Sequence, residues 1–338
     1  MALKGLGLNG KILLSAYTCI RVPEAILAAG CEPVFVDLSE SGVSFDPSVL
    51  GGYEPGELCA IIITHLWGCP VHMEKILSEA RRIGAIVIED CALSLGTSPG
   101  GHMVGTSGAL AIFSFGRGKT LNLGGGGALV VNDASLLNIL KNRSGAGGDR
   151  EVALLQERVK TILLSREMWR AYFPWLSYLK YWKQGSWLWE SVITEPHPME
   201  CSGRREDSIF LRLLSLVDIG NILEHKAEIS EIYQKGINET SWVRSFIPKR
   251  EKGVICPSYP LIVQGRDELF LHLRKQGVDC GLSFSYSAGK VCSRGVYPEA
   301  ERVAERILTL PVHEGVTIEC ARKIVSLINE WIPPVAQG

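Results

Sequence analysis

The segment CAIIITHLWGCPVHMEKILSEARRIGAIVIED, residues 59–90, decides the fold. It begins and ends with apolar runs of strand length, and the residues between them, 71–84, have the spacing of an amphipathic helix. Similar apolar runs lie on either side: KILLSA (11–16), PVFVD (33–37), ALAIFSF (109–115) and GALVVN (127–132). Continuous apolar strands separated by helices predict an α/β fold with a mostly parallel sheet and helices on both faces. Functional residues are expected at the carboxyl ends of these strands, where ligands bind such sheets.

The length and charge of the chain limit the kinds of protein it can be. Its 338 residues allow one large α/β domain and a smaller one. We expect a large domain over 1–150, an aromatic-rich helical linker over 151–205, and a long helix with a small α/β domain over 206–338. With 35 basic and 36 acidic side chains, the chain has no field of one sign, which argues against nucleic acid as the partner. The expected ligand is a small molecule.

The pattern of the C-terminal part is that of helices and a few strands. A long helical pattern covers 206–236, and a strand-like run covers 254–263. Further helices are predicted from Asp267, over 298–309 and over 317–332.

The cysteines and the first residues bear on the cellular compartment. The ten cysteines include no CxxC pair, and the chain opens on MALKGLGLNGK, with neither a secretory apolar region nor an apolar run of membrane-spanning length. These features favour a reducing cytoplasm, in which the cysteines serve as small buried side chains.

The segment GLGLNG, residues 5–10, matches the dinucleotide-binding pattern G-x-G-x-x-G. That pattern binds a pyrophosphate only when a strand precedes it and a helix follows. Here only four residues precede it and a strand follows, so we interpret it as the end of a helix and a turn.

Asp90 and Lys119 each follow a predicted strand. The alternatives are ordinary: an aspartate there often caps the next helix, and a loop lysine is usually solvated. However, Lys119 lies among glycines, between SFGRG (114–118) and NLGGGG (122–127), and glycines let a ligand approach the backbone closely. A lysine amine can form a Schiff base with an aldehyde cofactor, whose pyridinium nitrogen then needs a carboxylate. Lys119 and Asp90 could supply that pair.

Five successive segments resemble motifs of the DegT/StrS-type pyridoxal-phosphate-dependent sugar aminotransferases. They are AYTCIRVPEAILAAGCEPVFVDL (16–38), ITHLWGCPVHMEKI (63–76), IEDCALSLGT (88–97), FSFGRGKTLNLGGGGALVVND (113–133) and LPVHEGVT (310–317). The resemblance implies a fold type I aminotransferase, usually a homodimer. Its substrate would be a keto-sugar, usually nucleotide-linked, and an amino acid such as glutamate would be the amino donor, as in polysaccharide and cell-surface glycan biosynthesis.

The resemblance also implies roles for three residues toward pyridoxal 5′-phosphate. Lys119 matches the lysine that forms the Schiff base and carries the proton during transamination. Asp90 matches the carboxylate that keeps the ring nitrogen protonated, so that the ring can accept electrons. Ser114 matches a ligand of the cofactor phosphate, to which its hydroxyl can donate.

Other positions depart from the family pattern. Leu93 stands where the family commonly has Gln or His near the cofactor 3′-oxygen, and Cys19 replaces the aromatic residue that stacks on the ring. A Ser-Gly-Thr segment that binds the phosphate would precede Met1, so we expect the cofactor-binding domain to be incomplete at its N-terminus. In place of the asparagine loop that reaches the partner subunit, Arg204 or Arg205 could bind an anion or be solvated.

These departures keep two alternatives to an active aminotransferase open. One is a catalytically impaired homologue that acts as a binding or regulatory subunit. The other is sugar dehydration, but the related dehydratases tend to replace the lysine, and Lys119 is present.

The remaining candidates have ordinary interpretations. His65 and His72 have no carboxylate or thiol at ligand spacing, so we expect packed or exposed side chains and no metal. His313 has no assigned role. The aromatic stretch 169–189 is expected to pack in the core or a dimer interface; peripheral membrane contact is possible but not favoured.

Overall fold

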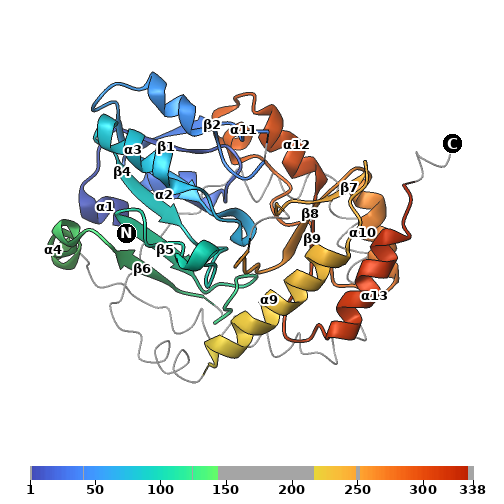
Figure 1. The fold of residues 1–338 in the computed structure, drawn as a ribbon. Helices are drawn as coiled ribbons and strands as arrows, with labels where there is room; N and C mark the ends of the chain where they lie inside the picture. Colours follow the sequence, from blue (N-terminus) through green and yellow to red (C-terminus); the bar gives the residue numbers. More distant parts are fainter. Residues whose placement is uncertain (1, 41, 124, 144–216, 249–251, 334–338) are drawn as a thin grey trace.

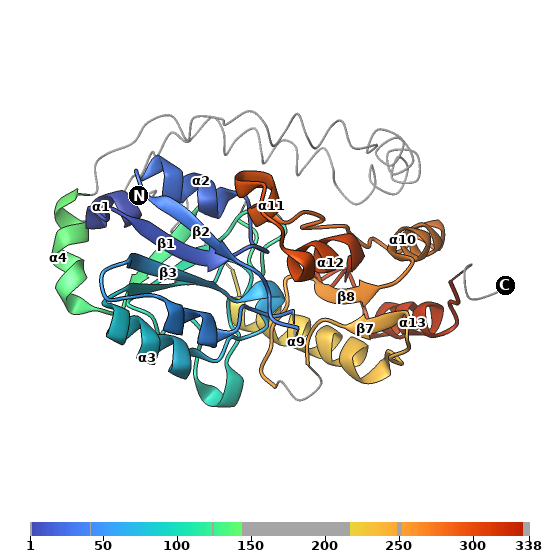
Figure 2. The same ribbon diagram turned by 90° about the horizontal axis from the view of Figure 1, so that it is seen from above.

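The computed structural model describes residues 2–40, 42–123, 125–143, 217–248 and 252–333. Within them, the strands form one six-stranded and one three-stranded sheet, which lie next to each other in Figure 1. The long helix α9 (Ile219–Gly236) runs between the two parts, as Figures 1 and 2 show.

The larger sheet has the strand order β2-β1-β3-β4-β5-β6. Its strands are β1 (Lys11–Ser15), β2 (Glu32–Val36), β3 (Leu58–Thr64), β4 (Ile86–Asp90), β5 (Leu110–Ser114) and β6 (Gly127–Val131). The first five are parallel to their neighbours, and β6 is antiparallel to β5. The predicted mostly parallel sheet is therefore confirmed, and the carboxyl ends of β3, β4 and β5 meet at one edge.

Helices cover both faces of this sheet because successive strand residues point to opposite sides. Ile12 and Leu14 belong to one apolar cluster, to which α1 (Ala2–Leu6), α2 (Arg21–Ala28) and α4 (Ala134–Arg143) contribute. Leu13, between them, belongs to another cluster with α3 (Met73–Ile83). Figure 2 shows α1 and α2 on one side of the sheet and α3 on the other, with α4 at the end of the sheet next to α1. Short 3₁₀ helices lie in the connections: η1 (Pro47–Gly52), η2 (Leu66–Gly68) and η3 (Pro99–Gly101).

The smaller sheet is antiparallel, in the order β7-β8-β9. Its strands are β7 (Val243–Ser245), β8 (Tyr259–Val263) and β9 (Ile307–Leu310). Its helices are α10 (Arg266–Lys275), α11 (Ala288–Ser293), α12 (Pro298–Arg306) and α13 (Ile318–Asn329). Apolar residues of α9, α10 and α13 share one buried cluster with β8 and β9.

Four of the predicted C-terminal elements have different bounds in the structure. The helix predicted over 298–309 ends at Arg306, because Ile307 begins a buried strand that pairs with β8. The strand predicted over 254–263 begins only at Tyr259, where the pairing with Leu310 of β9 begins. The helix predicted from Asp267 begins at Arg266, and that over 317–332 occupies Ile318–Asn329.

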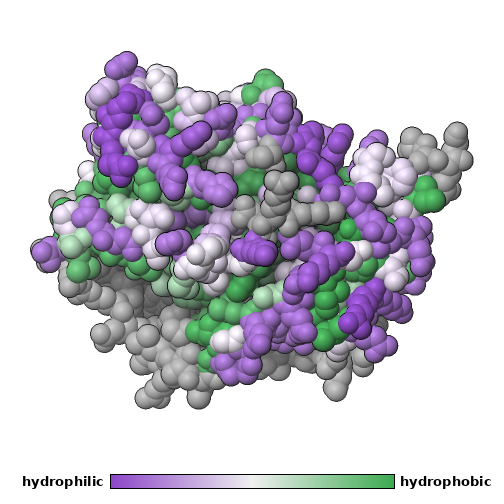
Figure 3. Space-filling view, in the orientation of Figure 1, coloured by the Kyte–Doolittle hydropathy of each residue, from purple (hydrophilic) through white to green (hydrophobic). Residues whose placement is uncertain are grey.

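Helix α9 begins later than the pattern predicted. The side chain of Asp218 accepts a hydrogen bond from the N–H of Asn221 at 3.1 Å and caps the helix before Ile219. Its outer face is hydrophilic in Figure 3, with apolar residues along its flanks, while Ile229 and Tyr233 are buried.

Several predictions concern residues outside the described ranges. They are the first part of the long helical pattern, 206–216, the aromatic stretch 169–189, Arg204 and Arg205, and both expected domain boundaries.

The interpretation of GLGLNG is confirmed. Helix α1 ends at Leu6, Gly7 adopts a left-handed φ of 66°, and β1 begins at Lys11. The structure thus places a helix end and a turn there, and a strand where a dinucleotide site would need a helix.

The prediction that the cysteines are buried is only partly correct. Five of the nine described cysteines are buried, but Cys292 and Cys320 are exposed and Cys19 and Cys59 are intermediate. All nine are free thiols. None of the described helices is long and apolar enough to cross a membrane.

Candidate active site

Asp90, Ser114 and Lys119 lie at or just beyond the ends of neighbouring strands. Asp90 is the last residue of β4 and pairs with Ile112 of β5. Ser114 ends β5, and its hydroxyl accepts a hydrogen bond from the N–H of Gly116 at 3.5 Å. The chain then turns back: the N–H of Lys119 donates to the carbonyl of Gly116 at 3.3 Å. The sheet therefore brings all three predicted residues to one edge.

The carboxyl group of Asp90 is buried, with 8% of the residue exposed. One carboxyl oxygen accepts the N–H of Ala92 at 3.1 Å, and the other accepts the Thr64 hydroxyl in a long hydrogen bond of 3.4 Å. Burial raises the pKa of Asp90, while these hydrogen bonds and the attraction of Lys119 act against the rise. A buried carboxylate in this position is stabilised by a cation placed against it.

A cavity of about 530 Å³ lies between the two sheets and is lined by Lys119, which borders the predicted site. Arg117, Leu93 and Trp67 line it from the large-sheet side. The small-sheet side contributes Pro257, Ser258, residues 279–281, Ser283, Phe284, Tyr286 and residues 309–313. This volume is within the range of small-molecule sites. Asp90 and Ser114 are not among the residues that line it.

The loop after α10 closes one side of the cavity, and no sequence pattern indicated it. The Tyr17 hydroxyl donates to the carbonyl of Phe284 at 3.0 Å, and the Tyr286 hydroxyl accepts the N–H of Ile20 at 3.1 Å. The ring of Phe284 meets that of Trp67 edge to face at 5.3 Å. Both ring-bearing residues have left-handed φ values, 56° and 55°, a strained conformation that concentrates at functional sites.

The two positions that depart from the family pattern lie within this region. Leu93 is buried, lines the cavity and packs in a cluster with Tyr17 and Trp67. Cys19 is partly buried, and burial raises the pKa of its thiol, an effect that Lys119 opposes. At neutral pH the side chain of Cys19 is therefore a neutral thiol close to Lys119 and Asp90.

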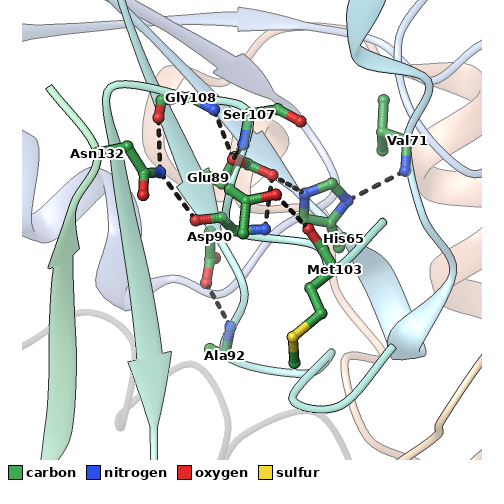
Figure 4. Close-up of polar contacts among 11 residues, drawn as sticks. His65, Val71, Glu89, Asp90, Ala92, Met103, Ser107, Gly108 and Asn132 are labelled. Carbon is green, nitrogen blue, oxygen red and sulfur yellow. Dashed lines mark hydrogen bonds and ion pairs between the residues drawn. The ribbon is translucent and has the colours of Figure 1, made fainter. Parts of the chain in front are cut away.

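A second buried carboxylate, Glu89, precedes Asp90, and sequence reasoning missed it. Its two oxygens accept the N–H groups of Gly105, Ser107 and Gly108 at 2.9, 2.8 and 2.6 Å. His65 lies 2.9 Å away through Nε2, as Figure 4 shows. Burial raises the pKa of Glu89, but these hydrogen bonds outweigh it and hold the pKa below its usual value.

The same contacts make His65 and its neighbours unsuitable as metal ligands. Folding gathers His65, Glu89 and Cys91, which sequence spacing did not reveal. However, Nδ1 of His65 accepts the N–H of Val71 at 3.0 Å, so Nε2 carries the proton donated to Glu89. Burial raises the pKa of the Cys91 thiol and keeps it protonated. His72, by contrast, is exposed at the start of α3, so the pair is one packed and one exposed histidine, as expected.

The sequence and the fold have counterparts among known proteins. A model of the DegT/DnrJ/EryC1/StrS aminotransferase family matches residues 1–157 and 210–329. The chain belongs to this family. The family's activity makes it an enzyme, a transaminase.

Curated relatives match this aminotransferase along nearly its whole length. GDP-perosamine synthase from Escherichia coli O157:H7 is 34% identical, over 98% of this chain and 82% of the relative. The dTDP-3-amino-3,4,6-trideoxy-alpha-D-glucose transaminase from Streptomyces venezuelae is 25% identical, over 100% and 81%.

Solved structures share the fold of this aminotransferase. DesV from S. venezuelae has a TM-score of 0.74 at 22% identity and covers 98% of this chain and 81% of its own. The sugar aminotransferase CalS13 from Micromonospora echinospora has a TM-score of 0.71 at 22% identity, with 98% and 84% covered. The fold class predicted from the sequence is confirmed, while the roles of Lys119, Asp90 and Ser114 stay predictions.

Proposed function

We propose that this aminotransferase uses pyridoxal 5′-phosphate to move an amino group from an amino acid such as glutamate to a nucleotide-linked keto-sugar. The observation that carries the proposal is the juxtaposition of Lys119 and the buried Asp90 beside a cavity of about 530 Å³. The donor set suits this cofactor: an amine for its aldehyde, a buried carboxylate for its protonated ring nitrogen and a hydroxyl for its phosphate.

When bound, the cofactor supplies an aldehyde and a ring that accepts electrons. Lys119 would hold the aldehyde through its amine and, once the amine of the substrate replaces it there, would move a proton at the reacting carbon. Asp90 pairs with the ring nitrogen and keeps it protonated. Ser114 donates its hydroxyl to the phosphate. Trp67 and Phe284, in edge-to-face contact, form an apolar part of the cavity wall.

The names of the relatives support the class of substrate. GDP-perosamine synthase, the dTDP-amino-sugar transaminase and a UDP-N-acetyl-3-dehydro-alpha-D-glucosamine aminotransferase from Acidithiobacillus ferrooxidans, 35% identical over 44% of this chain, are all named for nucleotide-linked sugars. We infer that this enzyme acts in polysaccharide and cell-surface glycan biosynthesis, in the cytoplasm and as a homodimer. We also retain the division into a cofactor-binding domain over 1–150, a linker over 151–205 and a C-terminal part over 206–338 as a proposal.

The first test is colour. Wild-type protein reconstituted with pyridoxal 5′-phosphate and freed of unbound cofactor is expected to show the visible band of a Schiff base, and Lys119→Ala is expected to lose that band, because the aldehyde without the amine absorbs at shorter wavelength. Lys75→Ala, on the exposed part of α3, is the matched control and should be coloured like the wild type. A wild type without the visible Schiff-base band, or a Lys119→Ala variant that keeps this band, would contradict the proposal.

The second test is the reaction with an amino donor. Glutamate should convert the visible spectrum of the wild type to that of the pyridoxamine form, with release of the keto acid. A coloured protein that no amino acid converts would instead support the catalytically impaired homologue. Light scattering of the same sample gives the mass, and a monomer would contradict the proposed homodimer.

A further inference from the structure

The carboxyl group of Asp90 is held by a chain of buried hydroxyls that reaches back to the segment after β1. Thr64 ends β3 and pairs with Asp90 in the register of the sheet. Its Oγ1 lies 3.4 Å from Oδ2 of Asp90 and 3.1 Å from Oγ1 of Thr18. Thr18 is 1% exposed and Thr64 is 8% exposed. Water therefore has little access to this chain of polar groups.

The direction of the hydrogen bonds follows from counting protons. An ionised carboxylate can only accept, and each hydroxyl has one proton to donate. Thr64 therefore donates to Asp90, and Thr18 donates to Thr64. The Thr18 hydroxyl thus polarises that of Thr64, and hydrogen bonds linked in this way strengthen one another.

We propose that Thr18 and Thr64 are positioning residues that keep the Asp90 carboxylate ionised and oriented toward the ring nitrogen of the bound cofactor. The inference rests on the proposed function. The N–H of Ala92 holds one carboxyl oxygen and Thr64 holds the other, which fixes the plane of the group. The Thr64 hydroxyl contacts Asp90 and the Thr18 hydroxyl contacts Thr64, so both act through the carboxylate.

Burial and the hydroxyl chain act on Asp90 in opposite directions. Burial favours the neutral acid, whereas hydrogen bonds to the charged form favour the carboxylate. Among the described residues, the other titratable groups that interact with Asp90 are Lys119, His65, Cys19 and Cys91. Replacement of Thr64 changes none of them, so its effect on Asp90 can be measured separately.

The decisive variants are Thr64→Val and Thr64→Ser. Valine has the shape of threonine without the hydroxyl, and serine keeps the hydroxyl. A hydrogen bond to a charged group is worth enough that Thr64→Val should weaken pyridoxal 5′-phosphate binding roughly tenfold. The pH at which the visible band is half lost, its pH midpoint, should rise in Thr64→Val. A ring nitrogen without its proton withdraws fewer electrons from the Schiff base, which then keeps its own proton to a higher pH. Thr64→Ser should bind the cofactor within about twofold of the wild type.

Thr97→Val is the matched control. Thr97 is fully buried, and its hydroxyl donates to the carbonyl of Gly68 at 3.1 Å and accepts the N–H of Ile255 at 3.0 Å. Its loss should lower the melting temperature, while the dissociation constant of the cofactor and the pH midpoint stay at their wild-type values. A merely structural role of Thr64 would give the same pattern for Thr64→Val.

The chain of hydroxyls also predicts that the effects of replacing Thr18 and Thr64 on cofactor binding depend on each other. Thr18→Val alone should weaken cofactor binding by about threefold, because it removes only the polarising neighbour. In the Thr64→Val background it should have no further effect. Additive effects, or wild-type cofactor binding and pH midpoint in Thr64→Val, would overturn the inference. A colourless wild type would instead overturn the proposed function, so the two failures are distinguishable.

Discussion

Glu89 and Asp90 are neighbours on one strand, yet their carboxyl groups lie in opposite chemical situations. Glu89 is fully buried, and three backbone N–H groups and His65 donate to its oxygens. Asp90 has two hydrogen bonds and the attraction of Lys119. The pKa of Glu89 is lowered and that of Asp90 is raised. A carboxylate whose hydrogen-bonding capacity is filled by the protein stabilises the fold, whereas one with remaining capacity can serve a ligand.

The largest expected effect comes from removing the charge of Asp90. Asp90→Asn keeps the shape of the side chain but cannot hold a protonated ring nitrogen. We expect transamination to fall by about a thousandfold, as when one preorganised electrostatic contact is lost from a catalytic site. The free energy of unfolding should change by less than about 1 kcal/mol. Single-turnover kinetics with glutamate and urea denaturation of the same samples measure both. Activity within about tenfold of the wild type would show that Asp90 does not act on the ring.

Glu89→Gln should give the opposite result. The amide group of glutamine presents two donors to a site where all the surrounding groups donate, and the charge-assisted hydrogen bonds are lost. We expect the free energy of unfolding to fall by about 3 kcal/mol, as when one partner of a buried pair is removed. The visible absorbance of the reconstituted protein should persist. The control is Glu79→Gln, which removes an exposed pair with Arg82 and should cost less than about 1 kcal/mol. Equal losses in both variants would refute a structural role for Glu89.

The smallest effect, and the sharpest contrast, is in the pH dependence of stability. The pKa of Glu89 is lower in the folded protein than in the unfolded chain. Ionised Glu89 therefore adds to the free energy of unfolding above its unfolded-state pKa, and this stabilisation is lost as the pH falls through its folded-state pKa. The pKa of Asp90 is higher in the folded, cofactor-free protein than in the unfolded chain. Its effect on the free energy of unfolding is therefore most favourable below its unfolded-state pKa, and this stabilisation is lost as the pH rises through its folded-state pKa. Urea denaturation of the cofactor-free protein between about pH 3 and 7 measures both.

The two variants should therefore differ from the wild type in opposite ways. The deficit of Glu89→Gln should shrink as the pH falls, and Asp90→Asn should gain relative to the wild type as the pH rises. Parallel pH profiles for the two variants would contradict the contrast between the two carboxylates.

Continuous apolar strands made the large sheet predictable from the sequence. Residues 59–64 and 85–90 are continuous apolar runs, which is the pattern of a strand that is buried on both faces. Such a strand can be predicted from its own residues, without knowledge of the strands it pairs with. Their ends in turn located Asp90. The C-terminal elements were harder to predict, because Ile307 continues an apolar helical pattern and becomes a strand only through pairing with β8.

The part of the site that sequence reasoning missed is the part made by distant partners. Nothing near Glu89 in the sequence indicates that residues 105–108 will turn their N–H groups toward it. In the same way, Tyr286 meets Ile20 across a separation of 266 residues. Local patterns report propensity and burial, whereas such contacts depend on how whole elements pack. The exposed Cys292 shows the same limit, because residue type alone does not fix burial.

The contact between Tyr17 and Phe284, 267 residues apart, also sets an order of events during synthesis. A chain emerging from the ribosome can pair the strands of its large sheet early, because their connections are short. One wall of the cavity, in contrast, is contributed by residues 257–313, which are made only after the strands of the large sheet. Contacts of such long range close late and slowly. Acquisition of the cofactor would therefore report that both sheets have been made and have packed against each other.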